Sequence, residues 1–175
     1  MNGNTTAAAG KTKKNIRILG IDPGYAIVGF GVLDYDGVRF TPAAYGAITT
    51  EAGMPFDKRL LAIHRDMEQI LGKYSPDCAA IERLYFTNNQ KTAIDVAQAR
   101  GVIVQSIAAR SLPIAEYTPL QVKVSVTGYG KAEKQQIMEM TRQLLGLAAI
   151  PRPDDAADAL AIAICHGHTI RFESF

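Results

Sequence analysis

Residues 17–35, RILGIDPGYAIVGFGVLDY, decide the fold, because they hold two strand-like runs separated by Pro23-Gly24. Both runs are rich in β-branched and aromatic residues, which favour β-strands. A third run of this kind, residues 38–50, follows the dipeptide Asp36-Gly37, a strong signal for a tight hairpin. The sequence therefore predicts three consecutive strands within residues 16–50 that form an antiparallel meander.

Further helices and strands are expected after the meander. Apolar residues recur at helical spacing over residues 55–73, which indicates an amphipathic helix. The later segments read in order as a short buried strand at 77–85, a helix at 88–110, a strand at 113–118, and helices at 119–128, 131–146 and 153–171. This order predicts an α/β domain in which helices flank one mixed five-stranded sheet. We expect the domain to span residues 16–170, between a flexible polar tail at 1–15 and a short C-terminal tail at 171–175.

Composition excludes several classes of protein. The 175 residues are 47% hydrophobic and 21% charged, as in an ordinary globular domain. The apolar run Ala159–Cys165 is too short to cross a bilayer, which takes about 20 apolar residues, and the N-terminus lacks the pattern of a secretory signal. Cys78 and Cys165 lie among apolar neighbours, which is typical of buried thiols in a reducing cytoplasm. We therefore expect a cytoplasmic protein with no membrane partner, and the net charge of +2 does not by itself indicate nucleic acid.

Two carboxylates stand where apolar runs end. Asp22 closes the first run, and the following Pro23-Gly24 suits the central positions of a type II turn. Asp22 could merely cap this turn, so the Asp-Pro-Gly motif alone leaves a structural and a functional interpretation open. Glu82 follows the buried run Cys78–Ile81, in which no basic residue occurs. A buried glutamate without a partner is uncommon, which favours a function for Glu82.

Two more carboxylates occur near the start of the last helix, in RPDDAADALAIAIC. Asp155 and Asp158 are three residues apart and fall on one helix face. Asp155 also fits a purely structural role, because acidic residues in a first turn complement the helix dipole. Convergence of all four carboxylates would require cations to offset their repulsion, and hard oxygen ligands select Mg²⁺ or Mn²⁺. One or two such ions can activate water for attack on a phosphodiester, so that no protein nucleophile is needed.

Four segments together resemble the RuvC family of Holliday-junction resolvases. They are GIDPG near the start, IERLYF in the middle, QVK followed by GYGKAEK, and DDAADALAIAICH near the end, and the resemblance covers residues 16–168. It implies an RNase H-like fold, a homodimer, and metal-dependent nicking of two symmetry-related strands of a four-way DNA junction in recombination and repair. It also implies 5′-phosphate and 3′-hydroxyl ends, a preference for Mg²⁺ with Mn²⁺ as a substitute, and cooperation with the branch-migration proteins RuvA and RuvB.

The resemblance also implies roles for individual residues. The catalytic and metal-binding carboxylates would be Asp22, Glu82, Asp155 and Asp158, and the position of Asp155 is held by histidine in some relatives. Lys123 of QVK and Lys134 of GKAEK would hold the scissile phosphate or stabilise charge that develops on it. The aromatic wedge of the family falls on Tyr85, with Phe86 beside it, and either or both would stack on a junction base. We expect Arg83, Lys91 and Lys131 to contact DNA, and the helix around Gly101 to lie at the two-fold interface.

Three other functions fit parts of the sequence. GIDPG also resembles the first phosphate loop of actin-like ATPases and sugar kinases, but such proteins have two related domains and this length fits one. A junction-binding module without catalysis would need the carboxylates only for folding. Another RNase H-like nuclease would act on RNA–DNA hybrids or ribosomal RNA precursors, and the lysines of QVK and GKAEK favour the junction enzyme over it.

Overall fold

The computed structural model describes residues 15–84 and 90–170. The predicted C-terminal tail, and the predicted N-terminal tail except its last residue, lie outside these ranges, so the domain boundaries stay a prediction. In the described part of the chain, no helix is both long enough and apolar enough to cross a membrane. Cys78 and Cys165 are free and buried, as expected from their apolar neighbours.

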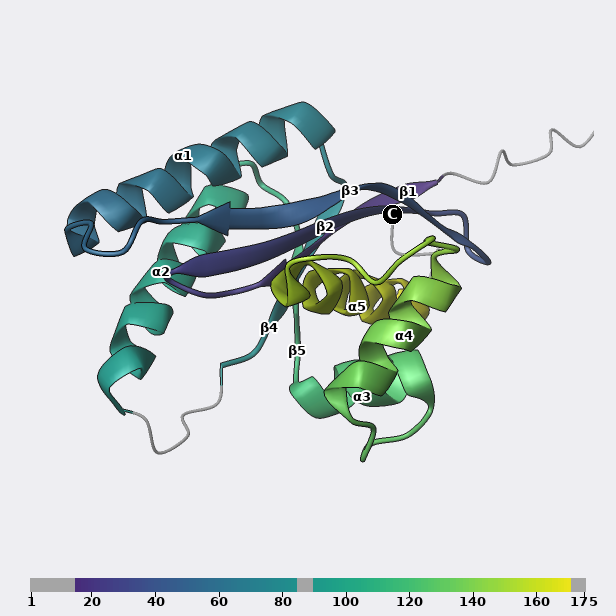
Figure 1. Ribbon diagram of the computed structural model, residues 1–175. Helices are drawn as coiled ribbons and strands as arrows, with labels where there is room; N and C mark the ends of the chain where they lie inside the picture. The colour runs from purple at the N-terminus through teal and green to yellow at the C-terminus, as the bar shows by residue number, and fades with distance from the viewer. Residues whose placement is uncertain (1–14, 85–89, 171–175) are drawn as a thin grey trace, which may run out of the picture.

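The predicted meander is confirmed. Strands β1 (Ile16–Asp22), β2 (Ile27–Tyr35) and β3 (Phe40–Thr49) pair in sequence order and are antiparallel (Figure 1). In the β2–β3 turn, Gly37 has a φ of 94°, and the side chain of Asp36 accepts hydrogen bonds of 2.8 Å from the backbone N–H groups of Val38 and Arg39. The predicted hairpin is thus confirmed, with a four-residue connection at 36–39 that the Asp36 side chain holds.

Two parallel strands complete the sheet. β4 (Cys78–Glu82) lies beside β1, and β5 (Ile114–Tyr117) lies beside β4, which gives the order β3-β2-β1-β4-β5. The predicted mixed five-stranded sheet is therefore confirmed. Because β1 and β4 are parallel and Ile21 pairs with Ile81, the last residues of these strands, Asp22 and Glu82, lie side by side at the same end of the sheet.

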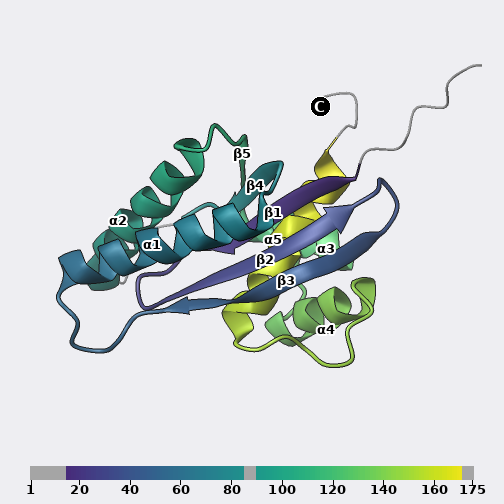
Figure 2. The same cartoon turned by 90° about the horizontal axis from the view of Figure 1, so that it is seen from above.

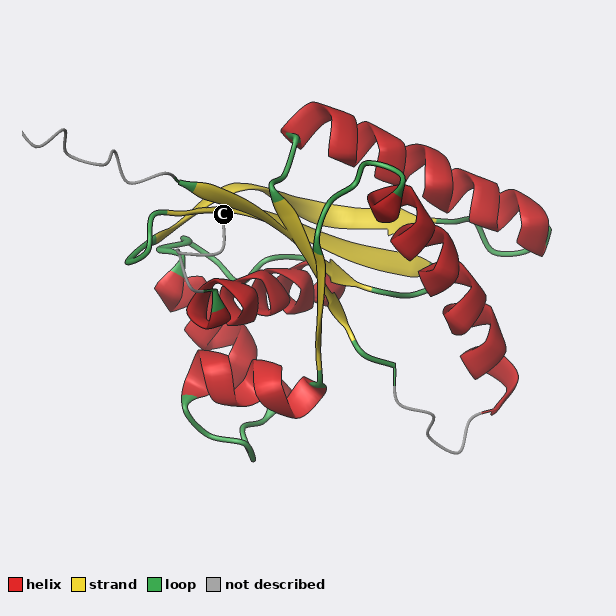
Figure 3. Ribbon diagram, turned by 180° about the vertical axis from the view of Figure 1, so that it is seen from behind, coloured by secondary structure: helices red, strands yellow, loops and turns green. Residues whose placement is uncertain are grey.

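Helices cover both faces of the sheet (Figure 3). On one face pack α1 (Phe56–Tyr74) and α2 (Gln90–Ala108), and on the other α5 (Asp154–Thr169) lies against the strands with α3 (Pro119–Thr127) and α4 (Lys134–Leu144) beside it. Each face has its own apolar core, and α5 is buried along most of its length. The central position of α5 explains why its sequence is almost entirely alanine and aliphatic between its acidic first turns and its histidines.

Glycines bring α5 unusually close to the sheet, which it crosses behind β1 and β2 (Figure 2). A Cβ atom at Gly20 of β1 would lie 2.1 Å from the carbonyl oxygen of Ala159, and one at Gly29 of β2 would lie 2.0 Å from that of Asp155. At Gly31 a Cβ atom would meet the side chain of Leu160 at 2.8 Å. Strand glycines often mark such close backbone approach, and here they set the distance between α5 and the edge that carries Asp22.

We expect Gly20→Ala to lower the free energy of unfolding by about 3 kcal/mol or more, because the added methyl group must displace helix backbone that cannot yield by a rotamer change. Gly72→Ala is the matched control. Gly72 lies in α1, where a Cβ atom meets only an arginine side-chain nitrogen at 3.9 Å, so alanine there should raise stability by up to about 1 kcal/mol. Urea denaturation measures both, and equal stability of the two variants would contradict the close approach of α5.

Candidate active site

Five of the six predicted catalytic residues line one cavity of about 240 Å³. Asp22 and Glu82 reach it from the adjacent ends of β1 and β4, and Asp158 reaches it from the second turn of α5. Lys123 of α3 and Lys134 at the start of α4 complete the charged lining, and the remaining wall is formed by Pro119, Val122, Ile137, Ala161 and Ile162. Residues from five elements, far apart in sequence, therefore meet at one edge of the sheet.

Asp22 is the most perturbed acid of the site. Burial, followed by the negative charges of Glu82, Asp158 and Asp155, raises its pKa from 3.8 to about 8, and the opposing effect of Lys134 is smaller. The predicted type II turn after it is wrong. Such a turn needs a positive φ at Gly24, and Gly24 is not among the glycines that have one. Glycine is needed there for a different reason, since a Cβ atom would lie 2.0 Å from the carbonyl oxygen of Ile27.

Glu82 and Asp158 are perturbed in the same direction. Burial is the first cause of the raised pKa of Glu82, and the charge of Asp158 adds to it. Burial also raises the pKa of Asp158, although its hydrogen bond to Lys134 partly offsets the effect. Acids whose charged forms are disfavoured in this way are common at functional sites. The raised pKa values of the three acids indicate that the positive charge near them does not fully offset their negative charge.

Lys134 contributes a positive charge beside Asp158. Its Nζ atom lies 3.0 Å from Oδ2 of Asp158 and 3.8 Å from Oδ2 of Asp154. The helix start that positions it is fixed by Gln136, whose side chain accepts a 2.8 Å hydrogen bond from the backbone N–H of Glu133. Asp154 also pairs with Arg152. No pattern in the sequence indicated the contact between Asp154 and Lys134.

Lys123 and Asp155 occupy different positions around the cavity. Lys123 is half-buried on α3, whose N-terminus is capped by Thr118: its hydroxyl accepts from the N–H of Gln121, and the Gln121 side chain accepts from the N–H of Thr118. Asp155, the sixth predicted catalytic residue, is half-buried and is not part of the cavity lining. Its charge nevertheless raises the pKa values of Asp22 and Asp158, which places it close to both.

The residues predicted to contact DNA are less completely described. Arg83, directly after Glu82, is exposed, and its Nε atom lies 3.8 Å from Oε2 of Glu116. Arg100 contacts the other oxygen of Glu116, Oε1, at 2.6 Å. Lys131 is exposed in the turn before α4. Tyr85, Phe86 and the side chain of Lys91 lie outside the described residues, so their predicted roles stay predictions.

The donor set suits a hard cation. Carboxylates are the ligands that Mg²⁺ and Mn²⁺ prefer, and the raised pKa values of Asp22, Glu82 and Asp158 indicate unmet demand for positive charge. In their present positions, the described side chains include no group of three or more acids, histidines or cysteines close enough to hold a metal ion. Lys134 is the cation that now pairs with Asp158.

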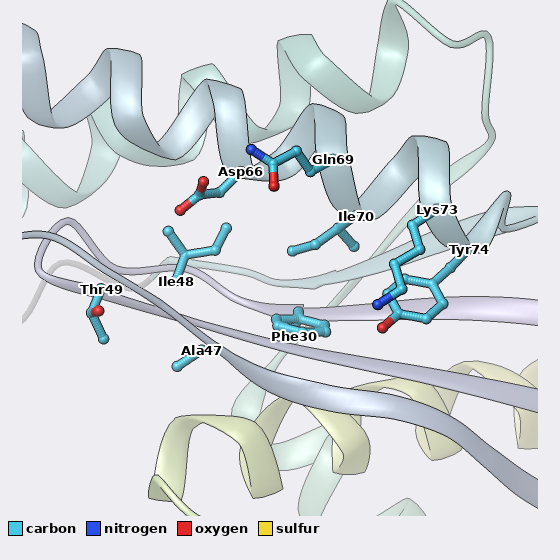
Figure 4. A pocket seen from close by; sticks show the side chains of 9 residues that line it. All are labelled: Phe30, Ala47, Ile48, Thr49, Asp66, Gln69, Ile70, Lys73 and Tyr74. Atoms are coloured by element: carbon cyan, nitrogen blue, oxygen red, sulfur yellow. The ribbon is translucent and has the colours of Figure 1, made fainter.

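A second cavity, of about 380 Å³, lies on the opposite face of the sheet, between α1 and strands β2 and β3 (Figure 4). Phe30 and Ile48 form its floor, and Asp66, Gln69 and Lys73 of α1 line its upper wall. None of the predicted catalytic residues reaches it. This second cavity therefore has no part in the chemistry that the sequence predicts.

Comparison with known proteins agrees with the geometry. The family model for crossover junction endodeoxyribonuclease RuvC matches residues 18–166. The chain is 53% identical to the enzyme of that name from Ruminiclostridium cellulolyticum, over 88% of this chain and 93% of the relative, and 54% identical to that from Alkaliphilus oremlandii, over 89% and 94%.

Solved structures lead to the same family. The structure of T. thermophilus RuvC in complex with a Holliday junction substrate is 31% identical, with a TM-score of 0.85 over 91% of this chain and 97% of the other. The yeast mitochondrial Holliday junction resolvase Ydc2, 14% identical with a TM-score of 0.64, shares the fold. These matches confirm the RNase H-like fold, and members of the family are metal-dependent nucleases. The chain belongs to the RuvC family of crossover junction endodeoxyribonucleases, the Holliday junction resolvases of DNA recombination and repair.

Proposed function

We propose that this chain cuts two symmetry-related strands of a four-way DNA junction at the cavity between β1, β4 and α5, leaving 5′-phosphate and 3′-hydroxyl ends. The observation that carries the proposal is the convergence of Asp22, Glu82 and Asp158 with Lys123 and Lys134 in one open cavity. The T. thermophilus relative, solved with a Holliday junction substrate, supports a substrate of the same kind here.

Each residue has a distinct proposed task. Asp22, Glu82, Asp155 and Asp158 would hold Mg²⁺, with Mn²⁺ as a substitute. When bound, the metal lowers the pKa of water and stabilises the attacking and leaving oxygens of the phosphodiester. Lys123 and Lys134 would hold the phosphate and offset charge that develops on it, a task that suits a compact ammonium group. Arg83, Lys91 and Lys131 would contact flanking phosphates, and Tyr85 or Phe86 would stack on a junction base.

A homodimer is part of the proposal, because two identical sites match a substrate with two symmetry-related strands. Within one chain a Cβ atom at Gly101 would meet nothing within 4 Å, so this part of α2 leaves space in which a second copy could pack. Nearby on α2, Ile94 is 64% exposed. The proposal predicts sedimentation at twice the 18.9 kDa mass of the chain, and cooperation with RuvA and RuvB in the cytoplasm rests on the family resemblance alone.

The test of function is cleavage of a synthetic four-way junction by the purified chain with Mg²⁺. The matched controls are a linear duplex of the same sequence and a reaction with EDTA. We expect paired, symmetrical nicks in the junction only, with product ends that DNA ligase can rejoin. Equal cutting of the linear duplex would contradict junction resolution, and cutting in EDTA would contradict metal dependence.

A further inference from the structure

Four charged side chains form a continuous line at the rim of the catalytic cavity. Arg152 pairs with Oδ1 of Asp154, the other oxygen of Asp154 lies 3.8 Å from Nζ of Lys134, and the same Nζ lies 3.0 Å from Oδ2 of Asp158. The order is therefore Arg152, Asp154, Lys134, Asp158. Only the last two line the cavity itself.

The contact between Lys134 and Asp158 conflicts with a metal at Asp158. The ammonium group already contacts Oδ2 of Asp158, and it would repel a divalent cation bound to the same carboxylate. Metal binding at Asp158 therefore favours a position of Lys134 farther from this carboxylate. Its side chain is 57% exposed, so nothing in its immediate packing prevents it from turning into solvent, where it would be lost to the phosphate.

We propose that Asp154 is a positioning residue that receives the Lys134 ammonium group when metal binds Asp158, and so keeps it at the cavity. The proposal rests on the proposed function in one respect, namely that Asp158 binds the metal. Asp154 and Asp158 are four residues apart on α5, which puts them one turn apart on the same side of the helix. Lys134 already lies within 4 Å of both.

The position of Asp154 suits this task. Arg152 occupies one of its oxygens, which orients the other toward Lys134. Asp154 is also not part of the cavity lining, so it can hold a cation without taking part in metal binding. Exposed ion pairs contribute little to folding stability. If Asp154 served only folding, its removal should leave the metal affinity almost unchanged.

The test is a double-mutant cycle of Mg²⁺ affinity, measured by titration calorimetry without DNA. Lys134→Met removes the competing cation and should bind Mg²⁺ roughly tenfold more tightly, as expected for one unit charge at about 3 Å in a solvated site. Asp154→Asn leaves Lys134 with Asp158 alone and should bind about threefold more weakly. In the double variant the effect of Asp154→Asn should vanish, because its partner is gone.

The cycle separates the possible outcomes. If Asp154→Asn weakens Mg²⁺ binding equally with and without Lys134, Asp154 acts directly on the metal, and the proposal is overturned. If Asp154→Asn has no effect in either background, the contact is structural only, which also overturns it. A natural chain that binds no Mg²⁺ would instead count against the proposed function.

Two further variants guard against an effect on folding. Arg152→Gln removes only the outer member of the line and leaves Asp154 and Lys134 in place, so it should change Mg²⁺ affinity less than Asp154→Asn does. Asp57→Asn changes an exposed acid of α1 that pairs with Lys58 at 3.5 Å and should leave Mg²⁺ affinity unchanged. With DNA, Asp154→Asn should need more Mg²⁺ for half-maximal cleavage. Thermal unfolding of each variant verifies that the fold is retained.

Discussion

Asp22→Asn is expected to abolish junction cleavage and to leave junction binding intact. The amide keeps the size of the side chain at the end of β1 but removes the negative charge that lies between Glu82, Asp155 and Asp158. Loss of a residue that merely supports a metal ligand costs about 10- to 100-fold, so loss of a direct ligand should cost more than about 100-fold in cleavage rate. Binding should persist because affinity for DNA comes mainly from contacts between basic residues and phosphates.

The measurement pairs single-turnover cleavage with a gel-shift titration of the same four-way junction. Asp57→Asn is the control, because it makes the same chemical change at an exposed position that is not part of the cavity lining. It should cut at the natural rate. A binding defect in Asp22→Asn as large as its cleavage defect would mean that Asp22 maintains the DNA-binding surface rather than the chemistry.

Without metal, Asp22→Asn should also be more stable than the natural chain, by an amount that grows with pH. Burial and neighbouring acids raise the pKa of Asp22 from 3.8 to about 8. Between these two values the folded chain keeps a proton that the unfolded chain releases, so the free energy of unfolding falls as the pH rises and levels off above about 8. From about pH 5 to pH 8 the difference between the two proteins should grow by up to about 4 kcal/mol.

Urea denaturation in EDTA at several pH values measures this difference. The asparagine side chain cannot release a proton, so the stability of Asp22→Asn should vary less with pH than that of the natural chain. Added Mg²⁺ should stabilise the natural chain most at high pH, where the carboxylates are charged. A stability difference that stays constant from pH 5 to pH 8 would contradict the raised pKa.

The sequence predicted the order of strands and helices because their signals are local. Asp36-Gly37 determines a hairpin within four residues, and alternating or helical spacing identifies each element by itself. The sequence predicted a mixed sheet but not which strands pair in parallel. The pairing of β1 with β4 depends on contacts such as that between residues 18 and 78, which no local pattern contains. Gly24 shows a further limit. A glycine is needed either for a positive φ or for space, and the sequence does not distinguish these two causes.

The candidate site was predictable to a similar degree. Asp22, Glu82 and Asp158 could be selected because a charge within an apolar run is costly, and they line one cavity. The ion pair between Lys134 and Asp158 could not be predicted, because it joins two helices whose packing is set elsewhere. The pairing of Arg83 with Glu116, which joins the residue after β4 to β5, was not predicted either. The close approach of α5 to Gly20 and Gly29 was not predicted either, because it depends on the packing of the last helix on the first two strands.

The central place of α5 has a consequence for the time at which the enzyme becomes able to cut DNA. A chain leaves the ribosome from its N-terminus, and the meander can pair early because its contacts are local. Asp158 arrives long after Asp22, on the helix that covers Gly20 and Gly29. A nascent chain that ends before residue 154 therefore contains Asp22 and Glu82 but lacks Asp158, and under the proposed roles of these residues it would not yet cut DNA.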